Sequence, residues 1–173
     1  MGTAGTFTPE KLVMGILSSL PSIEEVVALL VEEWGPLDCR SRPIPFEFTH
    51  YYDAEMGGPI QRTFLSFERL VDPSCLPAVK QRTNVLEGRF SDGSRRRVNL
   101  DPGLVALSRF TLATTKESAH RVPLSGGIYV EVTLLYGKGS FHPLEWTYPD
   151  FRSPTYLAVL NEIRARYKAQ LHG

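Results

Sequence analysis

The stretch NLDPGLVALSRFTLATTKESAHRVPLSGGIYVEVTLLY, residues 99–136, alternates short apolar runs with turns rich in Gly, Pro and Ser. Apolar runs of roughly four to eight residues bounded by such turns are typical of strands in a sheet. The stretch predicts a strand at 110–115 and a hairpin with strands at 120–124 and 128–136. Its charged residues fall at or near the ends of these strands, so the candidate site is expected in the same part of the chain.

The chain before this stretch alternates predicted strands with predicted helices. Ser22 followed by Glu25 fits a capping box, in which each side chain accepts a hydrogen bond from an amide at the start of a helix. Gly35 and Pro36 mark the end of that helix. The elements expected here are, in order, a strand at 12–17, a helix at 22–35, strands at 46–56 and 62–70, a helix within 73–87 and a strand at 95–100.

The order of these elements predicts an α+β fold. Strand, helix, strand, strand, helix, strand is the order of a ferredoxin-like βαββαβ core, whose sheet is mostly antiparallel. The further strand, the hairpin and a C-terminal helix opened by Ser153 and Pro154 extend this core. A chain of 173 residues has the length of one domain. We therefore expect a single α+β domain over 11–173, preceded by a frayed N-terminus over residues 1–10.

Composition and charge exclude several classes of protein. Nineteen basic and nineteen acidic residues leave no net charge, whereas proteins that bind duplex nucleic acid usually carry a basic excess. No run approaches the ~20 apolar residues that a membrane span needs, and no secretion signal opens the chain. Cys39 and Cys75 are too few for a disulfide scaffold and lack the spacing of zinc ligands. The sequence predicts a cytoplasmic protein with no metal or cofactor and no membrane or duplex nucleic-acid partner.

Polar side chains gather between the strand at 110–115 and the hairpin. Thr115, Lys116 and Arg121 place a hydroxyl and two fixed cations within seven residues, a set that suits an anion because arginine binds phosphate or carboxylate bidentately. The alternative is a solvated loop at a strand end. Glu68, on an adjacent strand, is either part of the site or the partner of an arginine in a salt bridge. The expected ligand-binding residues are Arg62, Glu68, Asn99, Thr115, Lys116 and Arg121.

Three ionisable residues are candidates for proton transfer. Glu131 is a carboxylate within an apolar strand, Asp101 precedes Pro102, where a strand is expected to end, and His120 carries an imidazole, a common general base. If Glu131 and Asp101 face one cavity, burial and mutual repulsion raise the pKa of one of them. The alternative is that Glu131 pairs with an arginine across the sheet and His120 is structural.

No motif assigns a reaction, so the sequence leaves open whether the protein is an enzyme. It lacks the GxxxxGK[ST] phosphate loop, the GxSxG elbow and the HExxH zinc motif. The leading hypothesis is a protein that binds a small anionic ligand, of which a nucleotide is one example, in a cleft at strand ends. The competing hypothesis is a non-catalytic interaction module or a homodimer. Its exposed sheet face would present Tyr51, Tyr52, Phe64 and Phe67 to a protein or single-stranded RNA.

Several segments, in order along the chain, are similar to a known family. They are LVMGILSS, EMG at 55–57, RTFLSFERLVDP at 62–73, NLDPG at 99–103, LATTK at 112–116, AHR at 119–121, GIYVEVTLLY at 127–136 and EWTYPDFRSPTY at 145–156. Through these segments the chain resembles the prokaryotic family named domain of unknown function 4416, from about Lys11 to Tyr167. The resemblance implies no activity, substrate or catalytic residue. Some similar sequences carry a GTP-binding label, but this chain has neither a phosphate loop nor an NKxD-type base-reading motif.

Overall fold

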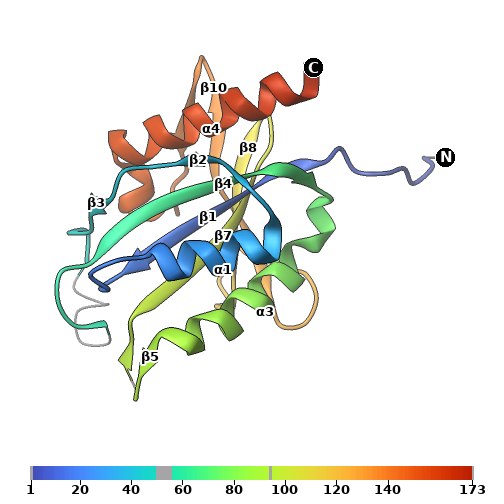
Figure 1. The fold of residues 1–173 in the computed structure, drawn as a ribbon. Helices are drawn as coiled ribbons and strands as arrows, with labels where there is room; N and C mark the ends of the chain where they lie inside the picture. The colour runs from blue at the N-terminus through green and yellow to red at the C-terminus, as the bar shows by residue number, and fades with distance from the viewer. Residues whose placement is uncertain (1, 50–55, 94, 173) are drawn as a thin grey trace.

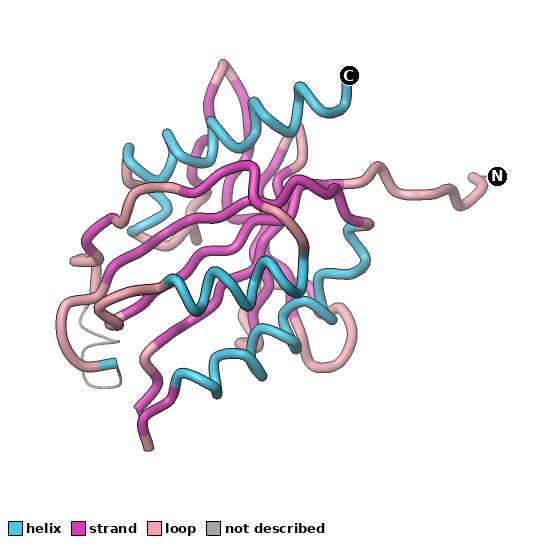
Figure 2. Tube along the Cα trace, viewed as in Figure 1, coloured by secondary structure: helices cyan, strands magenta, loops and turns pink. Residues whose placement is uncertain are grey.

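An antiparallel sheet with helices on both faces organises the computed structural model, which describes residues 2–49, 56–93 and 95–172 (Figure 1). The strands of this sheet are β1 (Glu10–Ser18), β2 (Leu37–Arg40), β3 (Ile44–Pro45), β4 (Gln61–Val71), β7 (Val98–Val105), β8 (Arg109–Thr114), β9 (Val122–Pro123), β10 (Tyr129–Gly137) and β11 (Ser140–Pro143). The helices are α1 (Glu24–Trp34), α3 (Leu76–Glu87) and α4 (Pro154–His172), with short 3₁₀ turns at Pro73–Cys75, Gly88–Phe90 and Asp150–Arg152. Residues 2–9 form no helix or strand, and they extend away from the sheet (Figure 2).

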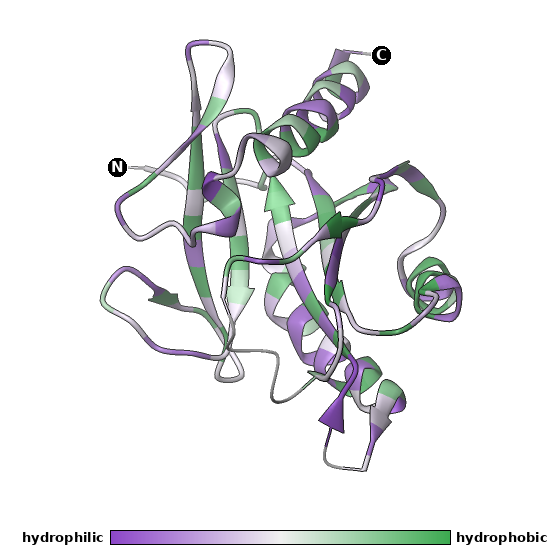
Figure 3. Cartoon of the chain, turned by 90° about the vertical axis from the view of Figure 1, so that its left-hand side faces the viewer, coloured by the Kyte–Doolittle hydropathy of each residue, from purple (hydrophilic) through white to green (hydrophobic). Residues whose placement is uncertain are grey.

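The strands lie in the order β11-β10-β8-β7-β1-β4-β2, with β3 paired to β4 and β9 to β10. All of these pairs are antiparallel. The predicted mixed α+β class, with a mostly antiparallel sheet and a C-terminal helix, is therefore confirmed. A separate hydrophilic hairpin, β5 (Ser91–Asp92) with β6 (Arg95–Arg96), projects beyond the end of α3 (Figure 3).

The hydrophobic core lies on both faces of the sheet, and β1 shows why. Leu12, Met14 and Ile16 pack in one cluster with side chains of α1 and α3. Val13 points the other way and packs in a second cluster with side chains of α4. A strand covered on both faces is apolar without alternation, which explains the continuous apolar run that predicted it. Helices α1 and α3 therefore cover one face, and α4 covers the other.

The two helix starts predicted from serines have different outcomes. Ser153 precedes α4 as predicted, and its Oγ accepts a hydrogen bond from the amide of Tyr156 at 3.3 Å. The predicted capping box of α1 is wrong, because that helix begins at Glu24 and no side chain caps it. Ser22 Oγ instead accepts from the amide of Glu24 at 3.3 Å, a local turn contact that serine often makes.

The second predicted strand, at 46–56, is misplaced. The strand that follows α1 is β2, and the segment from Phe46 to Thr49 forms no strand. Pro43 and Pro45 lack the amide hydrogens that a sheet ladder needs, so only Ile44 and Pro45 pair with β4 before the chain leaves the sheet. Residues 50–55 of the expected strand lie outside the described residues.

The exposed aromatic face that the interaction-module and homodimer hypotheses require is not present at Phe64 and Phe67. Each side chain is 1 % exposed. Phe64 packs in the cluster with α4, and Phe67 packs in the cluster with α1 and α3. Because helices cover both faces here, neither ring offers a surface for stacking. Tyr51 and Tyr52, the other two expected members of this surface, lie outside the described residues.

The sheet opens along a seam between β7 and β8. Strand β7 pairs with β1 over its whole length, but only its last three residues, from Gly103 to Val105, pair with β8. Beyond that point β7 stays with β1, whereas β8 stays with β10. We call this opening the seam. The predicted strand end at Pro102 is wrong, because β7 continues through this residue. Pairing with β8 begins only at Gly103, so Pro102 lies at an open strand edge, where proline is tolerated.

Side chains of α3 take the place of the missing strand neighbour at the seam. Lys80 Nζ donates to the backbone oxygen of Leu100 at 2.8 Å, and the amide of Leu100 donates to Glu87 Oε1 at 2.8 Å. Lys80 and Glu87 also lie 3.8 Å apart as an ion pair. The two backbone groups of Leu100 that β8 does not reach are thus hydrogen-bonded, so the seam carries no unpaired backbone group at this residue.

Replacing Lys80 with methionine is expected to destabilise the fold, because the Leu100 carbonyl and the Glu87 carboxylate would lose a buried cationic partner. Leaving a buried acceptor unpaired costs about 1–3 kcal/mol in the free energy of unfolding. Urea denaturation monitored by circular dichroism measures the change. The control is Lys168→Met on the exposed side of α4, which should change stability by less than about 0.5 kcal/mol. Equal unfolding midpoints for the two variants would contradict the role given to Lys80.

Candidate functional site

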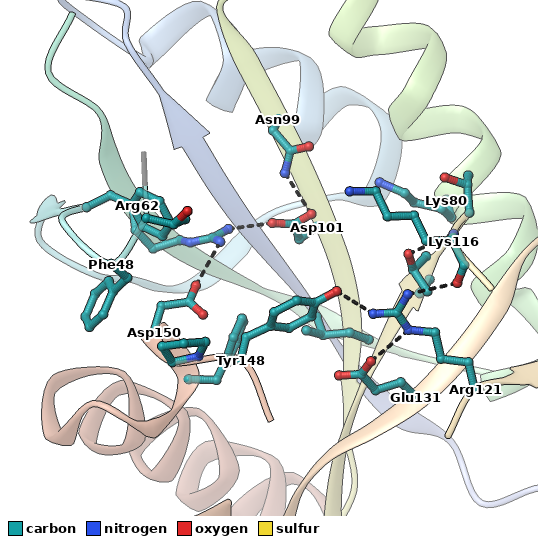
Figure 4. A pocket seen from close by; sticks show the side chains of 18 of the residues that line it. Phe48, Arg62, Lys80, Asn99, Asp101, Lys116, Arg121, Glu131, Tyr148 and Asp150 are labelled. Atoms are coloured by element: carbon teal, nitrogen blue, oxygen red, sulfur yellow. Dashed lines mark hydrogen bonds and ion pairs between the residues drawn. The ribbon is translucent and has the colours of Figure 1, made fainter. Parts of the chain in front are cut away.

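A cleft of about 600 Å³ lies along the seam (Figure 4). Its walls come from the two strands that part: Asn99 and Asp101 of β7 on one side, and β8 with the following Thr115 and Lys116 on the other. Lys80 of α3 and Asp150, from the segment that leads into α4, also line it. Cavities of roughly 300–1,000 Å³ commonly hold small ligands in proteins. The seam therefore provides a cleft of the size that a small molecule needs.

Arg62 occupies one end of the cleft between two carboxylates. It reaches in from β4 with its side chain only 3 % exposed, and its Nη1 donates to Asp101 Oδ2 at 2.7 Å. Its Nη2 lies 3.4 Å from Asp150 Oδ2. The guanidinium carbon lies 5.7–6.0 Å from the centroids of four aromatic rings, those of Phe46, Phe64, Phe151 and Tyr156. One cation facing two carboxylates gives this group a net negative charge when both acids are ionised.

The two carboxylates beside Arg62 have pKa values displaced in opposite directions. Burial acts to raise the pKa of Asp101, but the charge and hydrogen bond of Arg62 and the amide of Asn99 outweigh it, so the pKa lies below its usual value. Burial raises the pKa of Asp150 despite the attraction of Arg62. The distances explain the difference, because Arg62 lies nearer to Asp101 than to Asp150. Asp101 therefore stays ionised, and Asp150 holds a proton more readily.

Arg121 and Glu131 form the ion pair at the other end of the cleft. Arg121 Nε donates to Glu131 Oε2 at 2.9 Å, and the two side chains are 7 % and 2 % exposed. Arg121 also donates to the backbone oxygen of Lys116 at 2.9 Å and to the hydroxyl of Tyr148. Lys80 and Lys116 lie at this same end (Figure 4). Two of the cations in the lining also pair with Glu87, which does not line the cleft. The whole lining carries five cationic side chains and three carboxylates. They are Arg62, Lys80, Arg96, Lys116 and Arg121, against Asp101, Glu131 and Asp150.

His120 lies behind Glu131 rather than in the cleft. Its Nε2 is 3.1 Å from Glu131 Oε2, and its Nδ1 is 3.1 Å from Ser118 Oγ. The imidazole stacks on Trp146 with the ring centroids 5.4 Å apart and an angle of 12° between the planes. It lines a separate shallow hollow with Ala119, Glu145 and Trp146. Glu131 thus joins two environments, because its carboxylate faces the cleft and also contacts an imidazole that reaches the outer surface.

The structure brings together most of the residues that the sequence singled out. His120 contacts the cleft only through Glu131. Glu68 is not brought to it: this residue is exposed on β4, and Gln170 Nε2 of α4 donates to its backbone oxygen at 2.8 Å. The predicted residues that line the cleft are Arg62, Asn99, Asp101, Thr115, Lys116, Arg121 and Glu131.

Phe48, Lys80, Tyr148 and Asp150 are among the lining residues that sequence reasoning did not single out. Two of these residues, Lys80 and Asp150, stand out in the sequence pattern. Lys80 interrupts the apolar face of its helix, where a lysine needs a partner to be buried. Asp150 is an acid within an aromatic segment, WTYPDF, where an acid needs a partner if it is buried. Tyr148 and Phe48 gave no signal that distinguished them from core aromatics.

Neither a group of metal ligands nor a membrane-spanning helix is present in the part of the chain that the structure describes. Within residues 2–49, 56–93 and 95–172, no three His, Cys, Asp or Glu side chains are grouped closely enough to hold a metal ion. Across those same residues, none of the helices has the length and apolar character needed to cross a membrane. The cleft has several cations with one carboxylate at one end, and one cation with two carboxylates and aromatic rings at the other.

Comparison with known proteins gives one match, to a family model. A family model described as a domain of unknown function (DUF4416) matches residues 8–167, nearly the whole chain, and confirms the resemblance drawn from the sequence. No curated protein and no solved structure matches the chain significantly.

Proposed function

We propose that this chain, which belongs to the DUF4416 family, binds a small anionic ligand in the seam cleft. The observation that carries the proposal is the cleft's excess of cationic over acidic side chains in a chain with no net charge. Because cations gathered in a shielded hollow attract anions more strongly than exposed ones do, this concentration favours a negatively charged ligand.

Donors remain for an anion at the end of the cleft where Arg121 lies. Its guanidinium has five N–H donors, and three are used by Glu131, Lys116 and Tyr148. Lys116 is exposed and lines the same end. A guanidinium held by neighbours, with an ammonium beside it, is a common arrangement for phosphate or carboxylate. We place the anion between these two side chains.

Glu131 and His120 are the proposed route for proton exchange with a bound ligand. Glu131 lines the cleft, and His120 extends the contact to the outer hollow. Asp101 suits this role less well than its position in the sequence suggested. Its lowered pKa makes it a poor acceptor of a proton at neutral pH.

The detailed fold and the location of the protein form part of the same proposal. The strand order β7-β1-β4-β2, with α1 and α3 on one face, supports a ferredoxin-like βαββαβ core. Strands β8, β10 and β11 would extend that core beyond β7. Cys39 and Cys75 are both free thiols, which supports a reducing compartment such as the cytoplasm.

Lys116→Gln is the variant that tests anion binding most directly. Isothermal titration calorimetry with inorganic phosphate, ribose 5-phosphate and the common nucleoside monophosphates should detect binding to the unmodified chain. Loss of one charge-assisted hydrogen bond should weaken the affinity by about tenfold. Lys168→Gln, which lies on the exposed side of α4, is the matched control and should keep the full affinity. Absence of binding across the panel, or equal affinities for the two variants, would contradict the proposal.

A further inference from the structure

The two ends of the cleft differ in chemistry, which restricts the ligand further. Lys80, Lys116 and Arg121 lie at one end together with Glu131, the ion-pair partner of Arg121; we call this the cationic end (Figure 4). Phe48 and Asp150 lie at the opposite end beside Arg62, and we call this the aromatic end (Figure 4). A ligand that is only an anion would use the cationic end and leave the aromatic end empty.

The aromatic end presents an apolar ring to whatever enters. Phe48 lines the cleft, yet 39 % of it is exposed. Phe46 lies beside it with ring centroids 5.8 Å apart, and Phe48 also packs edge-on against Tyr156 at 5.9 Å. Its ring is thus supported by neighbours while part of it remains uncovered. A flat ring placed against Phe48 would remove that apolar surface from water and gain a stacking contact.

Two carboxylates and one guanidinium are the charged groups at the aromatic end. Asp101 and Asp150 share the single cation of Arg62, and the contact of Arg62 with Asp150 is long, at 3.4 Å. An ionised carboxylate has about four acceptor sites, so acceptor capacity remains beside the ring. The amide nitrogen of Asn99 donates to Asp101 Oδ1 at 2.7 Å, which uses one of its two N–H donors. A ring that carries N–H donors would satisfy these acceptors, whereas a hydrocarbon ring would not.

We propose that the ligand is bipolar: a phosphate at the cationic end, joined to a flat nitrogen heterocycle with N–H donors at the aromatic end, as in a nucleotide. This inference rests on the proposed anion binding and narrows it to one ligand class. The volume of about 600 Å³ accommodates both parts of such a molecule in one cleft. Figure 4 shows Tyr148 between the two ends, so the connecting part of the ligand would pass beside this side chain.

Titration calorimetry with matched ligands separates this inference from simple anion binding. The probes are ribose 5-phosphate, which has the phosphate without a ring, and the four common ribonucleoside monophosphates. At least one nucleotide is expected to bind about tenfold or more tightly than ribose 5-phosphate, since stacking a base is worth about 1–3 kcal/mol. An analogue of the preferred nucleotide that lacks the exocyclic amino group or the ring N–H of the base should lose most of this gain in affinity over ribose 5-phosphate.

Variants at the aromatic end complete the test. Phe48→Leu, which keeps the apolar volume without the ring, should reduce the advantage of the nucleotide and leave the affinity for ribose 5-phosphate unchanged. Phe48→Ala is the second variant. The control is Phe7→Ala, because Phe7 is an exposed phenylalanine near the N-terminus. Circular dichroism checks that each variant is folded.

The outcomes distinguish the two proposals. If ribose 5-phosphate binds as tightly as every nucleotide, the bipolar ligand is refuted and anion binding stands. If neither type of probe binds, both proposals are refuted. If Phe48→Leu and Phe48→Ala are folded and keep the full nucleotide advantage, the placement of the ring at the aromatic end is refuted. A nucleotide advantage that both variants reduce, and Phe7→Ala preserves, supports the inference.

Discussion

Arg62→Met is expected to lower the free energy of unfolding at pH 7 by about 3–5 kcal/mol, the cost of removing one partner from a buried ion pair. Asp101 and Asp150 both depend on this guanidinium, which is 3 % exposed. Without Arg62, two carboxylates would face each other in a shielded site with no cation between them. Urea denaturation at pH 7 measures the loss.

The pH dependence of Arg62→Met distinguishes lost charge from lost packing. The lowered pKa of Asp101 in the folded protein contributes stability that is present above the ordinary aspartate value of about 3.9 and is lost as the pH falls through the folded value. The raised pKa of Asp150 acts in the opposite sense, because a protonated Asp150 favours the fold at low pH. The difference between the variant and the unmodified chain should therefore shrink as the pH falls below about 4.

Arg42→Met is the control for this experiment, because Arg42 is exposed. It should change the free energy of unfolding by less than about 0.5 kcal/mol. The second pH is about 3.5, near the ordinary aspartate pKa. If Arg62→Met lowers the free energy of unfolding equally at pH 7 and at this pH, the ion pairs are not the cause of the loss. A loss no larger than that of Arg42→Met would refute the prediction altogether.

Gly103→Ala is expected to destabilise the protein by about 3 kcal/mol, at the upper end of the usual cost of overpacking. A Cβ at this position would collide with the backbone oxygen of Thr111 and lie 2.8 Å from Phe110 Cε2. The obstacle includes backbone, so no side-chain rotation relieves it. Gly103 is also the first residue of β7 to pair with β8, so the collision falls where the seam begins. Thermal and urea unfolding measure the effect.

Gly137→Ala provides a matched control on β10, where an added Cβ meets nothing within 4 Å. It should change stability by less than about 0.5 kcal/mol. If Gly103→Ala is as stable as Gly137→Ala, the close approach of β7 to β8 is not the reason for a glycine at this position. The pair of variants thus tests the geometry of the seam without any ligand.

Most of the elements could be predicted because each has a local cause. The apolar run of β1 reflects two covered faces, and the cap at Ser153 is a contact between near neighbours. The strand predicted at 46–56 was wrong because its aromatic alternation was read without the prolines before it. Pro43 and Pro45 limit the ladder in a way that alternation alone does not show.

The cleft could be predicted only in part. Glu131, Arg121 and Lys116 lie close together in sequence, so their meeting was foreseeable. The seam depends on where β7 stops pairing with β8, and register between distant strands is not encoded in any short pattern. Asp150 lies 88 residues from Arg62, so only the packed structure identifies it as a partner.

Helix α4 spans both parts of the sheet that the seam separates. On one side, Tyr156 packs on Phe64 of β4 with ring centroids 4.9 Å apart. On the other, Asn161 Oδ1 accepts from the amide of Phe141 in β11 at 3.1 Å. If docking of α4 fixes the spacing of the two walls, a ligand bound between them would in turn stabilise the docked helix, since thermodynamic coupling is reciprocal. The affinity of the proposed site would then depend in part on α4, none of whose residues line the cleft.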